Sequence, residues 1–284
     1  MQGVACMCPV QDIKKLLTPI VSDSVSGSTS IALQAIDCVR RYIRRTDVHV
    51  NARLCRTIAG YLIAAQPSMG IILNLADGLG NLSYPADRKA AVQYLDRFEA
   101  AIGVNMQGIA HSVGRLLRNA RLVMTYSLSS SVLAGLHEAY GQGSRFTVLV
   151  PESRPMNEGS RMMQELARSG IPVIYGTDAA ALSRLASGDI DAVLVGADAQ
   201  CGGGLVCKTG TRAIAELCRK TKTRLYGLCG TEKIVPRALI RKFVILNKPA
   251  RELTTLQNKS VIVWNRYFEV VSVHLFTRII TGSD

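Results

Sequence analysis

Charged residues are scarce in this chain of 284 residues, at 19%, whereas hydrophobic residues make up 48%. Intrinsic disorder requires the opposite balance, so the composition predicts a chain that folds, either as two modest domains or as one large one. No apolar run approaches the about 18 residues that cross a membrane. The short apolar stretch Val4–Val10 is followed by Lys14 and Lys15 rather than by a cleavage site. We therefore expect a soluble, cytoplasmic protein without a secretory leader.

The eight cysteines lack the spacing of a metal site or of a disulfide framework. The sequence has no C-x-x-C pair and no grouping of cysteine with histidine that suits zinc. In a cytoplasmic protein such cysteines are most often small, buried side chains with inert thiols. The sequence therefore predicts no metal.

Common motifs of nucleotide-binding and hydrolytic enzymes are also missing. Lys208-Thr209 follows Cys207 rather than the glycine of a P-loop, and no G-x-G-x-x-G segment follows a predicted strand. The serines from Ser127 to Ser131 lack the flanking glycines of a nucleophile elbow. None of the four histidines falls at a predicted strand end. We therefore expect no cofactor and no hydrolysis by a catalytic triad.

Positive charge exceeds negative charge, with 34 Lys+Arg against 21 Asp+Glu and a formal net charge of +13. Such an excess attracts anions, which include nucleotides, sugar phosphates, nucleic acid and acidic proteins. The densest group is Arg40, Arg41, Arg44 and Arg45, at helical spacing around Tyr42. Because only 5% of the residues are aromatic, the stacking platform typical of single-stranded nucleic-acid binding is largely missing. A solvated basic helix face is the simpler interpretation of this group.

Hydrophobic periodicity divides the chain into two parts. Up to about residue 115, apolar side chains recur at the 3.6-residue period of helices over 31–43, 54–65, 92–102 and 109–117. After Arg121, short apolar runs alternate with helical stretches. The predicted strands are 122–125, 146–150, 173–175, 192–195, 224–228, 243–246 and 261–264, and the predicted helices between them are 129–139, 159–169, 179–186 and 211–219.

Alternating strands and helices imply a parallel sheet covered on both faces, because parallel strands need crossover connections. The sequence therefore predicts an α/β chain with an all-helical N-terminal domain over 1–115. A Rossmann-like domain with a doubly wound parallel sheet follows over 116–284, with the boundary between residues 108 and 121.

Polar side chains follow several of the predicted strands. In an open parallel sheet, ligands bind at the carboxyl ends of the strands, where loops and helix N-termini meet. Those ends carry Ser127, Arg154, Asp178 and Asp198, and Lys208 follows a glycine-rich turn. Arg154 and Lys208 suit a phosphate, and Asp198 suits a hydroxyl or a proton transfer. We therefore expect both cations at one rim of the sheet, with a phosphate or Asp198 between them.

Each of these residues also has a plainer interpretation. Asp178 comes directly before an alanine-rich helix and is typical of a helix N-cap. Arg154 is equally well explained by a surface pair with Glu152, and Lys208 by an ordinary solvated lysine. Asp198 is the strongest candidate, because it follows a wholly apolar strand and the small residues before it leave room for a ligand.

Five ordered segments resemble one protein superfamily. They are VLVPESRP at 148–155, GIPV at 170–173, TDAA at 177–180, VLVGAD at 193–198 and KTGT at 208–211, and the end of the chain at 265–271 and 279–281 is similar too. This superfamily contains the alpha, beta and delta regulatory subunits of translation initiation factor 2B, together with ribose-1,5-bisphosphate isomerase and methylthioribose-1-phosphate isomerase. The resemblance implies a helical domain followed by a Rossmann-like domain that dimerises.

The resemblance also implies a site. The isomerases have an Arg-Gly-Ala segment that grips phosphate, a catalytic cysteine after the first strand, an aspartate, and an Asn-Lys pair. Matched residue by residue, the aspartate is Asp198 and the lysine is Lys208, whereas Cys207 stands at the asparagine and Ser127 at the catalytic cysteine. Ser26-Gly27-Ser28 stands at Arg-Gly-Ala without the arginine. The ligand-binding positions expected here are thus Gly27, Ser28, Arg154, Cys207 and Lys208.

Two of these departures favour the regulatory branch. A thiol titrates at about 8.5 and exchanges a proton at neutral pH, whereas a serine hydroxyl stays protonated without an adjacent base. The missing arginine removes a charge-assisted phosphate contact of about 1.5–3 kcal/mol. We therefore expect a protein of the initiation factor 2B type that binds a sugar phosphate or a nucleotide without converting it.

Two other functions stay open. The first is an aldose–ketose isomerase, an intramolecular oxidoreductase, in which Asp198 is a general acid on the ring oxygen and a group other than a cysteine completes the proton transfer. The second is an RNA- or ribosome-associated protein that uses the basic face from Arg40 to Arg45. The partners expected are a phosphorylated small molecule, a second copy of the chain in contact through Val270–Ile280, and subunits of a translation initiation factor.

Overall fold

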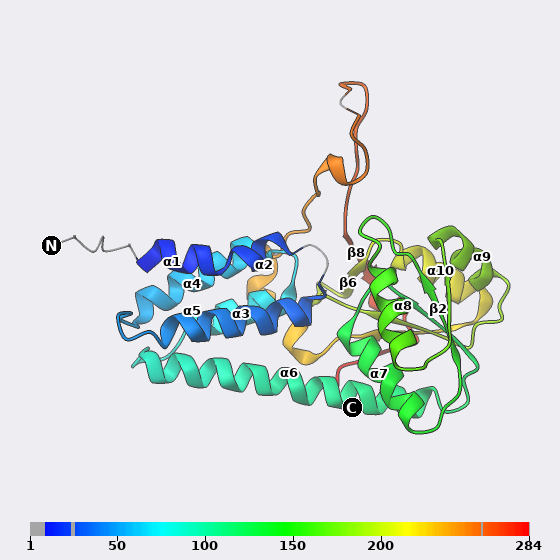
Figure 1. Cartoon of the computed structure of the whole chain (residues 1–284), viewed down its shortest axis with the longest axis horizontal. Helices are drawn as coiled ribbons and strands as arrows, with labels where there is room; N and C mark the ends of the chain where they lie inside the picture. Colours follow the sequence, from blue (N-terminus) through cyan, green and yellow to red (C-terminus); the bar gives the residue numbers. More distant parts are fainter. Residues whose placement is uncertain (1–8, 24–25, 257, 284) are drawn as a thin grey trace.

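The computed structural model describes residues 9–23, 26–256 and 258–283. Cys6, Cys8 and most of the stretch Val4–Val10 lie outside these residues. A bundle of helices is followed by an α/β region (Figure 1). Within the described ranges, no helix is both long and apolar enough to cross a membrane.

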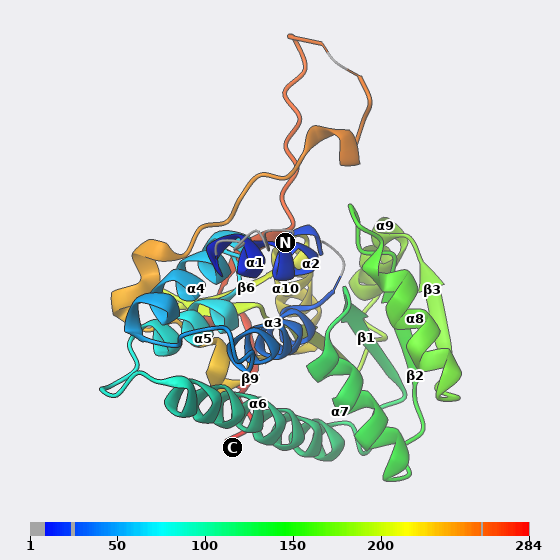
Figure 2. The ribbon, with the colours of Figure 1, turned by 60° about the vertical axis from the view of Figure 1, so that its left-hand side comes forward.

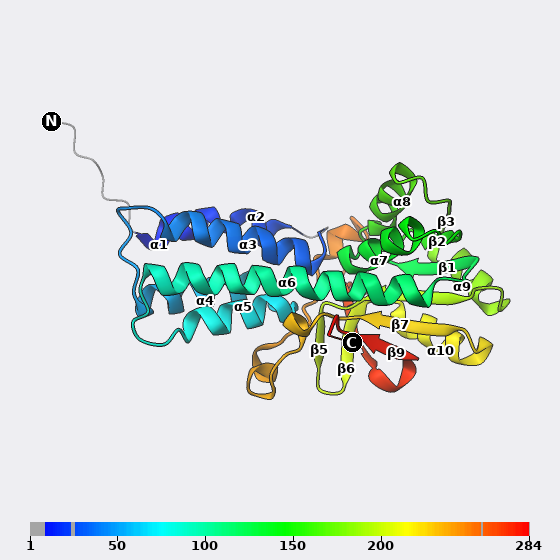
Figure 3. The same ribbon diagram turned by 90° about the horizontal axis from the view of Figure 1, so that it is seen from below.

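The N-terminal region is helical, as the periodicity predicts. Its elements are α1 (Pro9–Leu16), α2 (Thr18–Ser22), α3 (Ser28–Ile43), α4 (Ala52–Ala65), α5 (Gly70–Gly80) and α6 (Arg88–Leu116). The two segments expected over 92–102 and 109–117 belong to the single helix α6, which continues from the bundle along the α/β region (Figure 3). Helix α5 escapes the periodicity analysis because it is buried on almost every side, so no single apolar face stands out.

A parallel sheet forms the centre of the second region. Its strands are β1 (Leu122–Tyr126), β2 (Thr147–Pro151), β3 (Val173–Gly176), β4 (Ala192–Gly196), β7 (Arg224–Leu228) and β9 (Arg278–Ile280), in the order β3-β2-β1-β4-β7-β9. All neighbouring pairs in this sheet are parallel. The predicted α/β fold, with helices before a parallel sheet, is confirmed. Because β1 has β2 on one side and β4 on the other, the chain changes direction across the sheet between β1 and β4.

Helices cover both faces of the sheet. The connecting helices are α7 (Ser130–Gly141), α8 (Glu158–Arg168), α9 (Asp178–Ala186) and α10 (Thr211–Thr221). Side chains on alternate positions of a strand point to opposite faces. Val123 accordingly packs with residues of α6, α7 and α8, whereas its neighbour Met124 packs with residues of α9 and α10.

A smaller antiparallel sheet adds elements that the sequence analysis does not predict. It consists of β5 (Ala199–Cys201), β6 (Gly204–Lys208) and β8 (Phe268–Ser272). Three short 3-10 helices, η1 (Thr231–Lys233), η2 (Arg237–Lys242) and η3 (Ala250–Glu252), lie between β7 and β8, and η4 (Val273–Leu275) follows β8. The strands of this sheet are short, so periodicity alone cannot reveal them.

The strands expected at 243–246 and 261–264 are wrong. The segment 243–246 lies against the loop before α5, where Val244 N donates to Pro67 O and Ser68 Oγ donates to Val244 O. The segment 261–264 belongs to an arm, residues 247–266, which extends away from the rest of the molecule (Figures 1 and 2). An isolated antiparallel bridge between Asn247 and Arg266 closes its base. Several apolar side chains that suggest strands are exposed: Val244 in the first segment, and Val261 and Ile262 on the arm. Without a neighbouring strand to pair with, an apolar run does not form a sheet.

The basic helix face carries less free charge than the sequence suggests. Its ion pairs are Arg40 with Asp96 and Glu99, Arg41 with Asp37, and Arg45 with Asp47. These acidic partners lie on the same helix, on α6 and in the loop after α3. The pairs neutralise much of the field that a polyanion such as RNA would meet, so they favour a structural, solvated face.

One carboxylate ties the start of β1 to the start of β4. Asp191 Oδ2 accepts hydrogen bonds from the backbone N–H groups of Leu122, at 2.9 Å, and Arg121, at 2.8 Å. These two bonds hold the pKa of Asp191 below its ordinary value, and the bond from Leu122 has the larger effect. The carboxylate thereby helps fix the two strands whose far ends carry Ser127 and Asp198.

We expect the substitution Asp191→Ala to lower the free energy of unfolding by about 1–2 kcal/mol at about pH 7. Because the pKa is lowered in the folded state, this contribution is present above the unfolded pKa of about 3.9 and is lost as the pH falls through the folded pKa. Urea denaturation of both proteins should therefore show a difference that shrinks in acid. Asp189→Ala, which breaks an exposed pair with Arg184, is the control and should cost less than about 1 kcal/mol. A constant difference at every pH would contradict this assignment.

Candidate functional site

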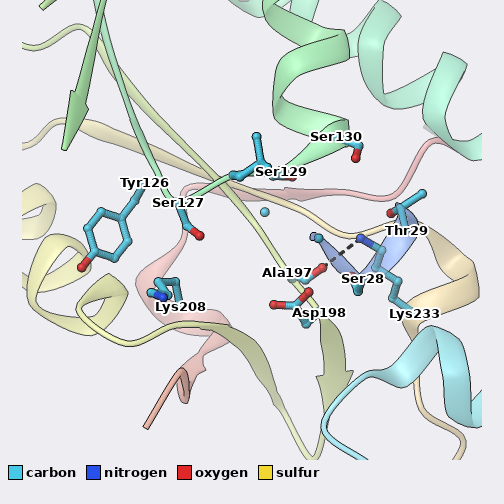
Figure 4. A pocket seen from close by; sticks show the side chains of 13 residues that line it. Ser28, Thr29, Tyr126, Ser127, Ser129, Ser130, Ala197, Asp198, Lys208 and Lys233 are labelled. Carbon is cyan, nitrogen blue, oxygen red and sulfur yellow. Dashed lines mark hydrogen bonds between the residues drawn. The ribbon is translucent and has the colours of Figure 1, made fainter. Parts of the chain in front are cut away.

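A pocket lies at the carboxyl ends of β1 and β4, where the strand order reverses. The residues that line it are Gly27, Ser28, Thr29, Tyr126, Ser127, Leu128, Ser129, Ser130, Gly196, Ala197, Asp198, Lys208 and Lys233. They come from the start of α3, the turn between β1 and α7, the end of β4, the end of β6 and η1 (Figure 4). Five of the sequence-predicted residues thus border one space: Gly27, Ser28, Ser127, Asp198 and Lys208.

Two helix N-termini meet at this pocket. Helix α3 begins after Gly27, and helix α7 begins after Ser129, whose side chain accepts a hydrogen bond from Val132 N at 3.4 Å. The hydroxyl groups of Ser30 and Ser130 are 3.5 Å apart, so the first turns of the two helices are in contact. Each first turn offers backbone N–H groups that no helical carbonyl accepts, and each helix N-terminus carries about half a positive unit charge. Together they form a surface that favours an anion.

Two buried lysines add full positive charges. Lys208 is 5% exposed, and its Nζ donates to Glu158 Oε1 at 2.6 Å while lying 5.2 Å from the centre of the Tyr267 ring. Lys233 is 3% exposed, and its Nζ donates to the carbonyl oxygen of Ala197 at 3.1 Å. The interpretation of Lys208 as an ordinary solvated lysine is therefore wrong. A lysine so deeply buried needs a negative partner, and Glu158 supplies one.

Asp198 is held in place by its own backbone. Its N–H donates to Val206 O at 2.8 Å, and its carbonyl oxygen accepts from Gly70 N at 2.9 Å. A Cβ at Gly70 would come within 2.5 Å of the Lys233 carbonyl oxygen, so only glycine lets α5 approach this closely. The loop after β4 is thus clamped between β6 and α5, with the Asp198 carboxylate lining the pocket (Figure 4).

Ser127 lies opposite, directly after β1. Its φ of 65° is in the left-handed region, which is uncommon for residues other than glycine. Its N–H donates to Ser153 Oγ at 2.8 Å, and Ser153 is fully buried. This conformation turns the chain from β1 into α7, so that Ser127 lines the pocket. Backbone strain of this kind is common at functional sites.

Arg154 and Cys207 lie elsewhere. Arg154 borders a different hollow at the base of the arm, together with Arg212, Trp264 and other residues. The expected arrangement, with Arg154 and Lys208 around one anion, is therefore not observed, and Glu158 takes the position beside Lys208 instead. The Cys207 side chain is fully buried within the core. Its burial is the main reason why the pKa of its thiol is raised well above the ordinary value, and the nearby charge of Asp198 raises it further. It stays a protonated core thiol.

Asp178 has a role other than the expected one. Thr177 is the N-cap of α9, and its side chain accepts from Ala180 N at 3.3 Å. The Asp178 carboxylate accepts from Ser153 N at 2.8 Å and from Arg154 N at 2.9 Å. It therefore fixes the loop after β2, whose Ser153 in turn supports Ser127.

The sequence analysis does not predict Lys233, Glu158 or the pocket hydroxyl groups of Thr29, Ser129 and Ser130. Lys233 follows Gly230-Thr231-Glu232, the turn after β7, so attention to that strand end could find it. Glu158 has no such signal, because its proximity to Lys208 depends on how α8 packs against β6. Within the described residues, no cluster of three or more His, Cys, Asp or Glu side chains could hold a metal ion.

Comparison with known proteins agrees with the resemblance of the sequence motifs. A model of the initiation factor 2 subunit family matches residues 24–283. A ribose 1,5-bisphosphate isomerase from Archaeoglobus fulgidus is 24% identical over 279 residues, which cover 96% of this chain and 88% of the relative. A methylthioribose-1-phosphate isomerase from Gemmatimonas aurantiaca is 30% identical over 288 residues, covering 95% of this chain and 83% of the relative.

Solved structures share the fold. The translation initiation factor eIF-2B of Pyrococcus horikoshii OT3 superposes with a TM-score of 0.82 at 21% identity, covering 96% of this chain and 95% of that one. A chain of the tetrameric eIF2B-beta2-delta2 complex from C. thermophilum has a TM-score of 0.73 at 18% identity, covering 97% of this chain and 90% of that one. This chain therefore has the same fold as these two translation initiation factor chains.

The burial of the Lys208–Glu158 pair leads to a test of stability. We expect Lys208→Ala to lower the free energy of unfolding by about 3 kcal/mol, because it leaves a carboxylate buried without its cation. The double variant Lys208→Met/Glu158→Leu should recover most of this loss, since apolar side chains of similar volume replace a buried pair at little cost.

Urea denaturation measures these changes in the free energy of unfolding, and Arg168→Ala is the matched control. It breaks the exposed pair with Glu165, at 2.7 Å, and should change stability by less than about 1 kcal/mol. If Lys208→Ala costs no more than Arg168→Ala, then Lys208 is solvated in solution and the pair carries no stability.

Proposed function

Because the chain belongs to the initiation factor 2 subunit family, we propose that the pocket between α3 and α7 binds a sugar phosphate. The observation that carries this proposal is the convergence of two helix N-termini with the buried Lys208 and Lys233 around one space. A phosphate group at the first turns would accept hydrogen bonds from backbone N–H groups and lie near Lys233. The names of the isomerase relatives support a sugar as the remainder of the ligand.

The proposed reaction is aldose–ketose isomerisation within that sugar. The named relatives favour this function over the regulatory one that the sequence motifs favour. Asp198 gives a proton to the ring oxygen, which breaks the bond between that oxygen and C1 and leaves C1 as an oxocarbenium centre that still carries the phosphate. A hydride then moves from C2 to C1, and the C2 hydroxyl becomes the ketone by returning a proton to the Asp198 carboxylate, so the sugar is both oxidised and reduced and no other reactant is needed. The carboxyl group of Asp198 suits the acid–base part, because two hydrogen bonds fix the backbone of this residue and its side chain borders the phosphate site.

One observation favours a second function, binding without conversion. Ser127 lies where the resemblance puts a catalytic cysteine, and its hydroxyl exchanges a proton far less readily than a thiol. Under this alternative the sugar phosphate is a regulatory ligand, and the protein acts through assembly with other subunits. The assembly proposed is a dimer or larger oligomer in contact through Val270–Ile280, where Val270 is 49% exposed.

Asp198→Asn separates the two functions. We expect the parent protein to convert ribose 1,5-bisphosphate or methylthioribose 1-phosphate to the ketose, and the variant to lose about 100-fold or more of the rate, as general acid–base residues do. Product formation is followed by nuclear magnetic resonance. Asp189→Asn, on the exposed turn before β4, is the control and should keep the parent's rate. Absence of turnover in the parent, with ligand binding retained, would instead establish the regulatory alternative.

Ligand binding itself is tested by melting temperature. A ligand present at about 100 times its dissociation constant adds about 2.7 kcal/mol to the stability of the folded protein. Millimolar phosphate or a sugar phosphate should therefore raise the melting temperature of the parent. We expect Lys233→Gln to lose most of this rise, because it removes a buried cation from the pocket, whereas Lys242→Gln at an exposed position should keep it. No rise in the parent with any of these anions would contradict the proposed function.

A further inference from the structure

The pocket lysine Lys233 lies on a turn with little structure of its own. The turn is the 3-10 helix η1, which has only three residues, and a helix this short is weakly held by its own hydrogen bonds. The Lys233 ammonium group donates to a neutral acceptor, the carbonyl oxygen of Ala197, whereas Lys208 is paired with the carboxylate of Glu158 (Figure 4). The charge of Lys233 is therefore available to an anion in the pocket, provided that other elements hold the turn in place.

Asn74, on α5, holds this turn on both sides of the lysine. Its Nδ2 donates to the carbonyl oxygen of Glu232 at 2.7 Å and to that of Ile234 at 2.9 Å. These residues directly precede and follow Lys233, so one amide group spans the backbone of the lysine. An amide suits this task, because it donates two hydrogen bonds and brings no negative charge that would compete with an anion for the lysine.

The same helix also holds the loop that carries Asp198. Gly70 N donates to Asp198 O at 2.9 Å, and the lack of a Cβ at Gly70 gives the Lys233 carbonyl oxygen room against α5. Gly70 and Asn74 are four residues apart, so they lie one turn from each other on the same face of α5. One turn of this helix therefore fixes the backbones of the proposed acid and of the proposed phosphate-binding lysine relative to each other.

A second asparagine reaches the turn from α6. Asn105 is 8% exposed, and its Nδ2 donates to Thr231 Oγ1 at 2.8 Å and to Glu232 Oε2 at 2.5 Å. Helix α6 is also joined to α3 by the ion pairs of Arg40. The helix that supports the lysine turn is thus tied to the helix whose N-terminus borders the pocket.

We propose that Asn74 and Asn105 are positioning residues for Lys233. They hold its turn against the helical bundle, so that the ammonium group meets an anion at the starts of α3 and α7 without rearrangement of the turn. Neither asparagine lines the pocket, so both act through the lysine. This inference rests on the proposed sugar-phosphate function and makes the helical bundle responsible for the affinity of the phosphate site.

The inference is tested by isothermal titration of the full chain with inorganic phosphate and with methylthioribose 1-phosphate. Asn74→Ala and Asn105→Ala are each made in the parent and together with Lys233→Gln, and the ligand is added until the weakest variant is saturated. We expect each alanine variant to bind about tenfold more weakly than the parent, but to cause no further loss once Lys233 is replaced, because the asparagines act through that lysine. A general effect on the fold would instead weaken binding by the same factor with and without Lys233.

Asn81→Ala is the matched control, because Asn81 is exposed at the C-terminal end of α5, and it should keep the parent's affinity. Urea denaturation shows which variants are folded under the conditions of the titration. If neither alanine variant folds, Thr231→Val decides in the same way, since it removes one acceptor of Asn105 at an exposed position.

Three results overturn the inference while the proposed function stands. The first is that the asparagine variants bind both ligands as tightly as the parent does. The second is that they lose the same factor of affinity in the Lys233→Gln protein, and the third is that Lys233→Gln alone binds like the parent. If the parent binds neither inorganic phosphate nor methylthioribose 1-phosphate, the proposed function fails and the inference fails with it.

Discussion

The parallel pairing of β1 with β4 is the constraint on which the site depends. These strands are neighbours in the sheet although β2 and β3 come between them in sequence. The chain leaves β1 toward α7 on one side and returns through α9 before β4, so the loops after the two strands separate and leave a space between them. Ser127 and Asp198 lie at the two sides of this space because each directly follows one of the strands. The start of α3 then closes it from the helical bundle, which brings the second helix N-terminus to the pocket.

The parts of the fold that depend on local pattern can be predicted from the sequence. Buried parallel strands such as 192–196 are short, wholly apolar runs between helices, and their ends follow from the position of the first polar residue. That is why the strand pattern alone indicates Asp198 and Ser127 as site residues. Gly27 and Ser28 follow only from the family resemblance, since the helical bundle gives no rule for where its helix starts will meet the sheet.

What cannot be predicted depends on contacts between distant segments. Lys208 and Glu158 are 50 residues apart, and only the packing of α8 against β6 brings their charges together. The same reason explains why Arg154, although it follows β2 as expected, lies at the base of the arm instead of beside Lys208. Its loop is turned away by the bonds from Ser153 and Arg154 to Asp178. The strands predicted at 243–246 and 261–264 are wrong for a different reason. These apolar runs have the composition of strands but no partner strand to pair with.

The position of the sole tryptophan of the sequence has a practical consequence. Trp264 lies on the arm with 73% of its surface exposed, and the guanidinium of Arg266 lies 5.7 Å from its ring. Its fluorescence therefore reports on the surroundings of the arm and hardly at all on the packing of the sheet or the helical bundle. Unfolding of the core would leave this signal almost unchanged, whereas any molecule that covers the arm would shift it to shorter wavelength. The protein thus contains a natural optical probe for contacts at one particular place on its surface.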